Sequence, residues 1–239
     1  MLSWKRRLSV PAAAAIILIT MLVCGGTALA ITGGVSDANR HPNAGILVDT
    51  AGGTYCSGTL ISSTVFLSAA HCATDGSTVS VSFDSTYTSS SRLYSGTFHA
   101  GEHEIAVVVF RSPIRGIAPA QLPTPGQLTN LPSHQRFTVV GYGQRQWPIN
   151  VGPIRREYAL TTLSSVSPTY LRLSNLGGSG GACFGDSGGP NFLRAGSTGT
   201  NVIAGITSAG DPFCSYEYAA YRLDTQRARA FLGQYVRLP

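Results

Sequence analysis

Short apolar and β-branched runs alternate along the chain with clusters of Gly, Pro, Ser, Asn and Asp. Such clusters are typical of the turns between strands. Many short strands at this spacing favour antiparallel barrels or sandwiches over a parallel α/β sheet. The predicted strands are Thr54–Ser62, Thr64–Ser68, Thr78–Phe83, Glu104–Phe110, Arg136–Tyr142, Arg156–Thr162, Thr169–Leu173 and Val202–Thr207.

Two segments depart from this pattern. Ser112–Ser133 is rich in proline and also carries apolar residues, which favours an extended connection over a disordered linker. Near the end, Asp224–Val236 places apolar residues at spacings of three and four, so we expect an amphipathic helix packed against the second half of the protein. The residues of its apolar stripe are Ala228, Phe231, Leu232 and Tyr235.

The first thirty residues have the pattern of a secretory signal peptide. Lys5, Arg6 and Arg7 precede an apolar run over 12–23, and Ala28-Leu29-Ala30 has the small-x-small form of a cleavage site. A membrane anchor is the alternative, but the run is short for a spanning helix. A lipid-modified Cys24 is a second alternative, which the bulky Val23 before it disfavours. We therefore predict cleavage after Ala30.

Charge and length limit the function of the remaining part, residues 31–239. Loss of Lys5, Arg6 and Arg7 takes three positive charges from the formal net charge of +6 and leaves +3. No lysine remains, and the arginines are scattered apart from Arg155-Arg156, which gives no support to nucleic-acid binding. The length suits one unit of two small barrels.

Four cysteines remain after the predicted cleavage: Cys56, Cys72, Cys183 and Cys214. In an exported protein, four cysteines predict two disulfides, and three pairings are conceivable. A metal site is the competing interpretation. The cysteines lack the Cys-x-x-Cys spacing of common zinc sites, so we expect no metal.

Two motifs predict nucleophilic catalysis. Ser187 lies in Gly185-Asp186-Ser187-Gly188-Gly189-Pro190, and His71 lies in Leu67-Ser68-Ala69-Ala70-His71-Cys72. A serine hydroxyl is a poor nucleophile at neutral pH and needs an adjacent base such as histidine. Glycines beside the serine allow the sharp turn that aims backbone N–H groups at a developing oxyanion.

These motifs resemble those of the trypsin/chymotrypsin-like serine proteases. Further segments extend the resemblance, in the family's order, from about Ile31 to the end of the chain. They are Ile31-Thr32-Gly33-Gly34, Cys56-Ser57-Gly58-Thr59-Leu60-Ile61, Thr138-Val139-Val140-Gly141-Tyr142-Gly143 and Gly205-Ile206-Thr207-Ser208-Ala209-Gly210.

The resemblance implies an all-β fold of two packed six-stranded antiparallel β-barrels, chymotrypsin-like, with a C-terminal helix. We place the first barrel at about 31–115, the connection at about 116–135 and the second barrel at about 136–239. The implied disulfides are Cys56–Cys72 and Cys183–Cys214.

The resemblance also assigns roles at the site. His71 would be the general base, Ser187 the nucleophile, and the N–H groups of Gly185 and Ser187 the oxyanion hole. Where the family has an aspartate before an apolar strand, this chain has Glu104, so the expected triad is Ser-His-Glu. Glu102 is a weaker candidate because it does not adjoin the strand.

In the family a new N-terminal ammonium pairs with the aspartate before the catalytic serine. Here that pair would join Ile31 to Asp186, and removal of the signal peptide would itself create the ammonium. A buried carboxylate without such a partner is costly. We therefore expect no separate zymogen stage.

The family's substrate pocket maps onto small residues: Gly181, Ala182, Ser208, Ala209 and Gly210. Gly181 stands where trypsin-type enzymes have a floor aspartate, so a basic side chain would be left unpaired. Ala219 narrows the expected pocket only modestly. We predict a neutral side chain, small to medium or aromatic, before the cut bond.

The sequence thus predicts a secreted, monomeric serine endopeptidase. It would act on protein or peptide substrates, with a proteinaceous inhibitor as a further candidate partner. We expect no cofactor, no nucleic acid and no membrane contact after signal removal. A catalytically impaired homologue acting as a binding module is the main alternative. An esterase or another acyl transferase on the same fold is a further one.

Overall fold

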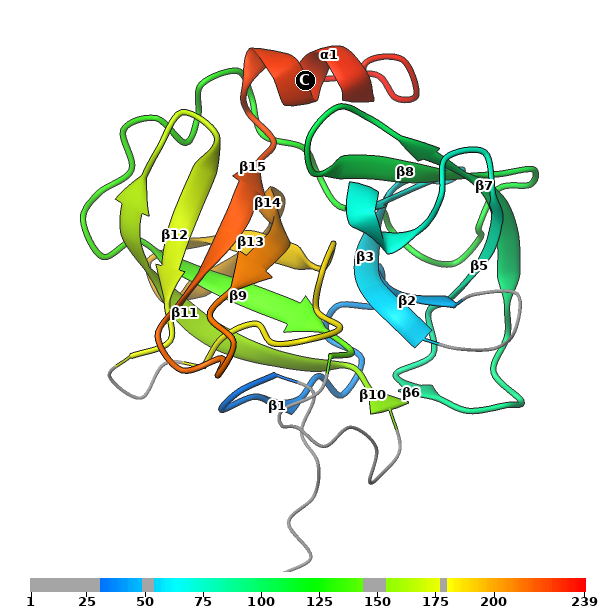
Figure 1. Cartoon of the computed structure of the whole chain (residues 1–239), viewed down its shortest axis with the longest axis horizontal. Helices are drawn as coiled ribbons and strands as arrows, with labels where there is room; N and C mark the ends of the chain where they lie inside the picture. The colour runs from blue at the N-terminus through cyan, green and yellow to red at the C-terminus, as the bar shows by residue number, and fades with distance from the viewer. Residues whose placement is uncertain (1–30, 49–53, 144–153, 177–179) are drawn as a thin grey trace, which may run out of the picture.

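The computed structural model describes residues 31–48, 54–143, 154–176 and 180–239. The predicted signal peptide lies outside these residues and stays a prediction. Figure 1 shows two β-barrels side by side with a short helix, α1, at the upper edge of the view. The strands are β1 (Val35–Ser36), β2 (Ala44–Val48), β3 (Thr54–Ser62), β4 (Val65–Ala69), β5 (Thr78–Ser82), β6 (Thr86–Tyr87), β7 (Tyr94–Ala100), β8 (Ile105–Phe110), β9 (Arg136–Gly141), β10 (Ile154–Arg155), β11 (Glu157–Val166), β12 (Tyr170–Ser174), β13 (Pro190–Ala195), β14 (Thr198–Gly210) and β15 (Glu217–Arg222). A 3₁₀ turn covers Ala70–Cys72, and α1 covers Gln226–Leu232.

Both barrels are antiparallel and close through six strands. The first has the order β2-β3-β4-β8-β7-β5. The second runs β11-β12-β15-β14-β13-β9 and closes through a β9–β11 pairing, with β1 added beside β11. The predicted fold class is therefore confirmed, and each of the predicted strands lies at an observed strand.

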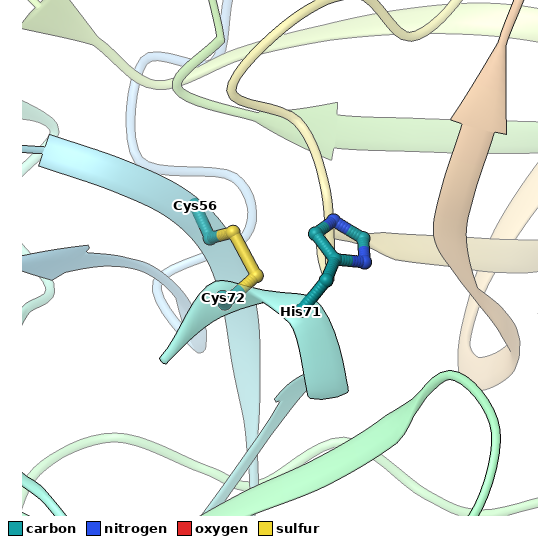
Figure 2. Close-up of side chains that lie close together, drawn as sticks. All are labelled: Cys56, His71 and Cys72. Carbon is teal, nitrogen blue, oxygen red and sulfur yellow. A yellow bond between two sulfur atoms is a disulfide. The ribbon is translucent and has the colours of Figure 1, made fainter. Parts of the chain in front are cut away.

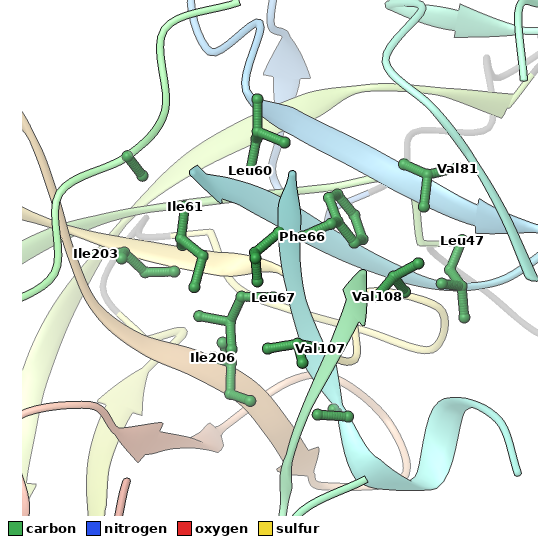
Figure 3. Packing of buried hydrophobic residues seen from close by; sticks show 14 of the residues in the cluster. Leu47, Leu60, Ile61, Phe66, Leu67, Val81, Val107, Val108, Ile203 and Ile206 are labelled. Atoms are coloured by element: carbon green, nitrogen blue, oxygen red, sulfur yellow. The ribbon is translucent and has the colours of Figure 1, made fainter. Parts of the chain in front are cut away.

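One hydrophobic cluster crosses the boundary between the barrels. It joins Phe66 and Leu67 of β4 to Ile203 and Ile206 of β14, as Figure 3 shows. Phe66, Leu67, Ile203 and Ile206 have no exposed surface. Apolar area removed from water contributes about 25 cal/mol per Å². This continuous core therefore fixes how the barrels pack, and with it the geometry of any site built from both.

Arg156 is a second link between the barrels, and it is polar. Arg156 lies between β10 and β11, and it is 1% exposed. Its Nε donates to Asp37 at 2.9 Å, and its Nη1 donates to the carbonyls of Ala44 and Phe83 in the first barrel. Burial alone would raise the pKa of Asp37, but its hydrogen bonds to His41 and the charges of His41 and Arg156 outweigh this and lower the pKa. A paired carboxylate of this kind stays ionised inside the protein.

The C-terminal helix is shorter than predicted and packs differently from our expectation. Thr225 caps it by accepting a hydrogen bond from the N–H of Ala228. Phe231 lies against Gly101 of the first barrel, where a Cβ would fall within 2.6 Å of the ring. Arg227 also contacts His103 at 2.7 Å. The helix therefore braces the loop that precedes Glu104, in addition to covering the core with Ala228 and Leu232.

Within the ranges that the structure describes, no helix is both long enough and apolar enough to span a bilayer.

The buried Arg156 network generates a prediction about stability. Replacing Arg156 by Met leaves Asp37 buried without its cation, so the free energy of unfolding should fall by about 3–5 kcal/mol. Denaturant unfolding followed by fluorescence measures this. The exposed neighbour provides the control, because Arg155→Met should change stability by less than about 0.5 kcal/mol. Equal stability of the two variants would contradict the role given to Arg156.

Candidate active site

His71 and Glu104 come together because neighbouring strands carry them to the same end of the first barrel. The register of β4 and β8 places Ala69 opposite Ile105. His71 follows β4 in the 3₁₀ turn, and Glu104 immediately precedes β8. The N–H of Ala70 donates to the Glu104 carbonyl at 3.0 Å, which fixes the backbone between them. His71 Nδ1 then lies 3.0 Å from Glu104 Oε2.

This pair is open to solvent. The His71 side chain is 45% exposed and that of Glu104 is 30% exposed. Water screens such a pair, so its attraction is weaker than that of a fully buried one. The Glu104 charge also reaches Tyr221, whose pKa is raised mainly by burial and further by this carboxylate. Tyr221 is itself almost fully buried.

The Cys56–Cys72 disulfide anchors the turn that holds the histidine. Figure 2 shows the bridge beside the imidazole ring. Sulfur and nitrogen atoms of Cys56, His71 and Cys72 lie within 4.8 Å of one another, a spacing that would suit a metal ion. A disulfide offers no thiolate ligands, however, so these residues do not fit a metal site as they stand. The bridge serves instead to hold the turn.

The serine loop lies against the first barrel. The N–H of Ser57, in β3, donates to the Ser187 carbonyl at 2.9 Å. The Ser57 hydroxyl donates to the Gly185 carbonyl at 3.0 Å and accepts from the N–H of Tyr142 at 2.9 Å. Cys72 Sγ is 4.0 Å from the Ser187 carbonyl oxygen, so the serine lies next to the histidine turn. Within the described ranges, no hydrogen bond joins the Ser187 hydroxyl to His71; in apo sites this bond often forms only when substrate binds.

Two glycines allow the loop its shape. Gly185 has φ +90° and Gly188 has φ +79°, values that residues with a Cβ rarely adopt. A Cβ on Gly188 would also meet the Ser57 carbonyl at 2.6 Å. No acceptor among the described residues takes the backbone N–H of Gly185 or of Ser187. Within the described part of the chain, both donors thus lack a partner, as an oxyanion hole requires.

Asp186 lies beneath this loop and holds it by hydrogen bonds. It is fully buried, and its carboxylate fills the place where a side chain on Gly141 would stand. One oxygen accepts from the N–H of Gly143 and the other from the N–H of Cys183, each at 2.8 Å. Burial raises the pKa of Asp186 to about 8, and the charge of Glu157 adds to the rise. The backbone hydrogen bonds only partly offset this.

Ile31 is also buried, in the core of the second barrel. Thr32 and Gly181 exchange hydrogen bonds of 3.0 and 2.9 Å and hold this segment beside the expected pocket. The Ile31 nitrogen, here part of the peptide bond to Ala30, donates to Glu157 Oε2 at 3.3 Å. The pairing of Ile31 with Asp186 remains a prediction for the processed protein.

A pocket of about 240 Å³ opens beside Ser187, on the second barrel. Its lining residues are Ala182, Cys183, Phe184, Ser187, Thr207, Ser208, Ala209, Gly210, Asp211, Cys214 and Tyr218. The Cys183–Cys214 disulfide ties the two sides of the pocket together. The Asp211 carboxylate accepts hydrogen bonds from N–H groups of its own loop, at Phe213, Ser215 and Tyr216.

The strand pairing beside this pocket and one of its expected lining residues differ from the expectation. Gly210 pairs with Tyr218, and Ala219 pairs with Ala209, so Tyr218 rather than Ala219 stands beside Gly210. The Tyr218 hydroxyl donates to Asn191 at 2.7 Å, which holds the ring in place. Gly181 does not line the pocket, because the Asn175 side chain fills the space that a side chain on Gly181 would take.

Several residues that shape the site were not identified from the sequence. They act through contacts between segments that lie far apart in the chain, and they are Ser57, Glu157, Asn175 and Tyr218. Only Ser57 stood inside a recognised motif. Its spacing to Ser187 carries no signal, since the contact depends on how the barrels pack.

Two closed barrels that meet at a histidine turn and a glycine-flanked serine loop have the architecture of the serine-protease class. The sequence comparison agrees, since the family model described as Trypsin matches residues 31–225. The chain therefore belongs to the trypsin family. No curated protein matches the sequence at a significant level.

Solved structures with this fold resemble it at low sequence identity. HL collagenase has a TM-score of 0.67 and 20% identity, covering 89% of this chain and 97% of its own. A structure of HBP has a TM-score of 0.69 and 16% identity, covering 87% and 98%. A mutant of human heparin binding protein (CAP37) has a TM-score of 0.68 and 17% identity, covering 85% and 95%. At these identities the likeness shows the fold alone.

Proposed function

We propose that this protein is a secreted serine endopeptidase that cleaves peptide bonds through an acyl-enzyme on Ser187. The observation that carries the proposal is the 3.0 Å contact between His71 Nδ1 and Glu104. An acceptor at Nδ1 keeps the proton on that nitrogen and leaves Nε2 able to accept one. Membership of the trypsin family supports protein substrates.

In the proposed reaction, His71 takes the proton of the Ser187 hydroxyl as its oxygen attacks the substrate carbonyl carbon. The imidazolium then gives this proton to the leaving amine, and an ester joins substrate and serine. Water, activated by His71, then attacks the ester, which releases the carboxylic acid product and restores the Ser187 hydroxyl. The N–H groups of Gly185 and Ser187 stabilise the oxyanion, and one such donor is worth about 10²–10³ in turnover. No cofactor takes part.

Glu104 fills the third position of the proposed triad. It orients the imidazole and stabilises the charge that forms on it. The extra methylene, compared with aspartate, lengthens the side chain by about 1.5 Å. Its 30% exposure places the carboxylate at the solvent edge of the site. We therefore expect a working triad with a smaller electrostatic contribution than a buried acid would give.

A binding module without catalysis is the second candidate. The solvent-exposed Glu104 favours it, and one structure of the same fold is named for heparin binding. The available oxyanion donors at Gly185 and Ser187 argue against it, because a pure scaffold has no need of them. An acyl transferase on the same fold would share this chemistry and differ only in the acceptor.

Export through the predicted signal peptide completes the proposal. Two disulfides suit an oxidising compartment, where such bonds persist. Cleavage after Ala30 would leave Ile31 as the first residue.

Reaction with an active-site probe tests the proposed function. The protein beginning at Ile31 should react with a fluorophosphonate and carry the adduct on Ser187, because only an activated hydroxyl attacks this probe. Mass spectrometry of the labelled peptide locates the adduct. Ser187→Ala and His71→Ala should both remain unlabelled. A folded, disulfide-bonded sample that stays unlabelled would leave only the binding module.

Substitutions at Glu104 test the third position. Glu104→Gln removes the charge and should lower kcat/KM by about 10²–10⁴, the upper limit being the cost of the neutral amide in a buried triad. Glu104→Asp keeps the charge but shortens the reach, and should cost about 10²-fold or less. Steady-state kinetics on a peptide substrate measure both. The control is the exposed Glu102→Gln, which should retain full activity. Full activity of Glu104→Ala would remove Glu104 from the mechanism.

The pocket supports a neutral side chain before the cut bond. Tyr218 is one of its lining residues, and the neutral amide of Asn175 fills the space beside Gly181. The Asn175 amide donates to the Cys214 carbonyl at 3.2 Å. The Asp211 carboxylate at the rim is occupied by its own loop. Among the described residues that line the pocket, Asp211 is the one carboxylate, so a basic side chain would find no unoccupied acid there, and the volume of about 240 Å³ suits a neutral side chain.

Tyr218 should set the size limit. Tyr218→Ala should enlarge the pocket. The ratio of kcat/KM for substrates with Phe before the cut bond to kcat/KM for substrates with Ala there should therefore rise by about 10-fold or more. Tyr218→Phe is the matched control: it loses the bond to Asn191 but keeps the ring, and should retain the parent preference. Profiling on a peptide library measures the ratio. A parent enzyme that cleaves mainly after Arg, or a Tyr218→Ala variant with an unchanged profile, would contradict this assignment.

A further inference from the structure

Two carboxylates, and not one, lie at the place where the mature N-terminus would be held. Glu157 is 2% exposed and Asp186 is fully buried. Glu157 in β11 pairs with Gly141 in β9, and the Asp186 carboxylate occupies the side-chain position of that same Gly141. The two acids therefore flank one backbone position, close enough for the charge of Glu157 to act on Asp186.

The two acids differ in what they bind. Both oxygens of Asp186 accept backbone N–H groups, from Gly143 and Cys183. The Ile31 nitrogen donates instead to Glu157 Oε2. A Cβ on Gly34 would lie 2.9 Å from the Ile31 Cβ and carbonyl oxygen and 3.1 Å from Glu157 Oε2, so the segment after Ile31 and the Glu157 carboxylate pack closely together here. The Thr32–Gly181 bridge keeps the Ile31 nitrogen in this position.

We propose that Glu157 is the direct acceptor of the mature Ile31 ammonium and forms with Asp186 a two-acid cradle. In this arrangement Glu157 is a positioning residue: it places the ammonium, which in turn compensates the Asp186 carboxylate and stabilises the serine loop. The inference deepens the proposed function and rests on cleavage between Ala30 and Ile31. Hydrolysis of that bond adds one water; Ala30 leaves with a carboxylate, and Ile31 gains an ammonium with three donors.

The charges around the cradle account for the need of this cation. Two buried carboxylates repel each other, and burial makes each charge costly unless a cation lies close to it. From β15, Tyr218 faces Asp186 and feels its charge. Arg156, next to Glu157 in sequence, points to Asp37 and to the first barrel. In the unprocessed chain, burial and then the charge of Glu157 raise the pKa of Asp186 to about 8, a rise that a cation beside the two acids would oppose.

A second carboxylate alters how the ammonium titrates. An α-amino group has an ordinary pKa of about 8. Each nearby anion favours the charged form, so the pKa of the amine in the folded protein rises by about 1–3 units per close carboxylate. The Ile31 ammonium contributes fully to stability below about pH 8, the pKa of the amine in the unfolded chain. This contribution is lost as the pH rises through the raised pKa of the amine in the folded protein. Glu157 should thus extend the active range to higher pH.

The test compares Glu157→Gln with the parent in the protein beginning at Ile31, checked by N-terminal sequencing. The fraction of Ser187 that reacts with a fluorophosphonate is measured from pH 6 to pH 11, together with the thermal unfolding midpoint. Plotted against pH, both the labelled fraction and the thermal unfolding midpoint should fall on the alkaline side. In Glu157→Gln the pH at which each has fallen halfway should be lower by about 1–3 pH units. At pH 7 labelling should change by only a few-fold, because Asp186 still holds the ammonium.

Three further variants separate positioning from a merely structural role. Glu157→Asp keeps the charge and should recover most of the alkaline range, which also covers the case in which Glu157→Gln fails to fold. Asp84→Asn, an exposed acid on the first barrel, makes the same change in net charge and should leave both curves unchanged. A chain with one extra residue before Ile31 lacks the buried ammonium, so Glu157→Gln in it should cause no further shift of the alkaline midpoint.

The outcomes distinguish the two proposals. An alkaline midpoint in Glu157→Gln equal to that of the parent would overturn the role of Glu157 and leave Asp186 as the sole partner. If the parent never reacts with the probe, the proposed function fails, and the unfolding curves alone decide the cradle. An equal shift in Asp84→Asn would assign the effect to net charge and would also overturn the cradle.

Discussion

The burial of the Asp186 carboxylate is the constraint on which the site depends. A buried carboxylate must find hydrogen-bond donors, and this one takes the N–H groups of Gly143 and Cys183. Those bonds fix the loop from Cys183 to Pro190, in which Gly185 and Gly188 adopt positive φ values. The same loop carries Ser187 and the available N–H donors. The loop that carries Ser187 is therefore shaped by a carboxyl group that is fully buried beneath it.

Contacts across the barrel boundary then align this loop with the histidine. Ser57 belongs to the first barrel but binds the carbonyls of Gly185 and Ser187 in the second. Arg156 reaches the opposite way, from the second barrel to the carbonyls of Ala44 and Phe83. With the shared apolar core, these links make the distance between the barrels a consequence of folding rather than of substrate binding.

The sequence predicted the architecture well where local pattern and tertiary environment agree. Thr54–Ser62 has the bounds of β3 because its β-branched and apolar residues suit a strand that is buried on both faces from Cys56 to Ile61. The prediction from the sequence missed β7 and β15. These strands consist of small, polar and aromatic residues, and they form because neighbouring strands pair with them. The motifs located His71, Glu104 and Ser187, while Glu157 and Tyr218 were missed, because their contacts follow from strand register between distant segments.

Glutamate at position 104 shows how the local structure constrains the chemistry. Its carbonyl is tied to Ala70, and β8 follows at once, so the backbone cannot retreat to make room for a longer side chain. The carboxylate still reaches His71 at 3.0 Å, and the extra length is taken up by a position nearer solvent. An acid in that position can orient the imidazole as well as an aspartate would. It stabilises the imidazolium less, since water already screens it. In the proposed mechanism, correct orientation of the imidazole therefore has to supply more of the transition-state stabilisation than the charge of Glu104 does.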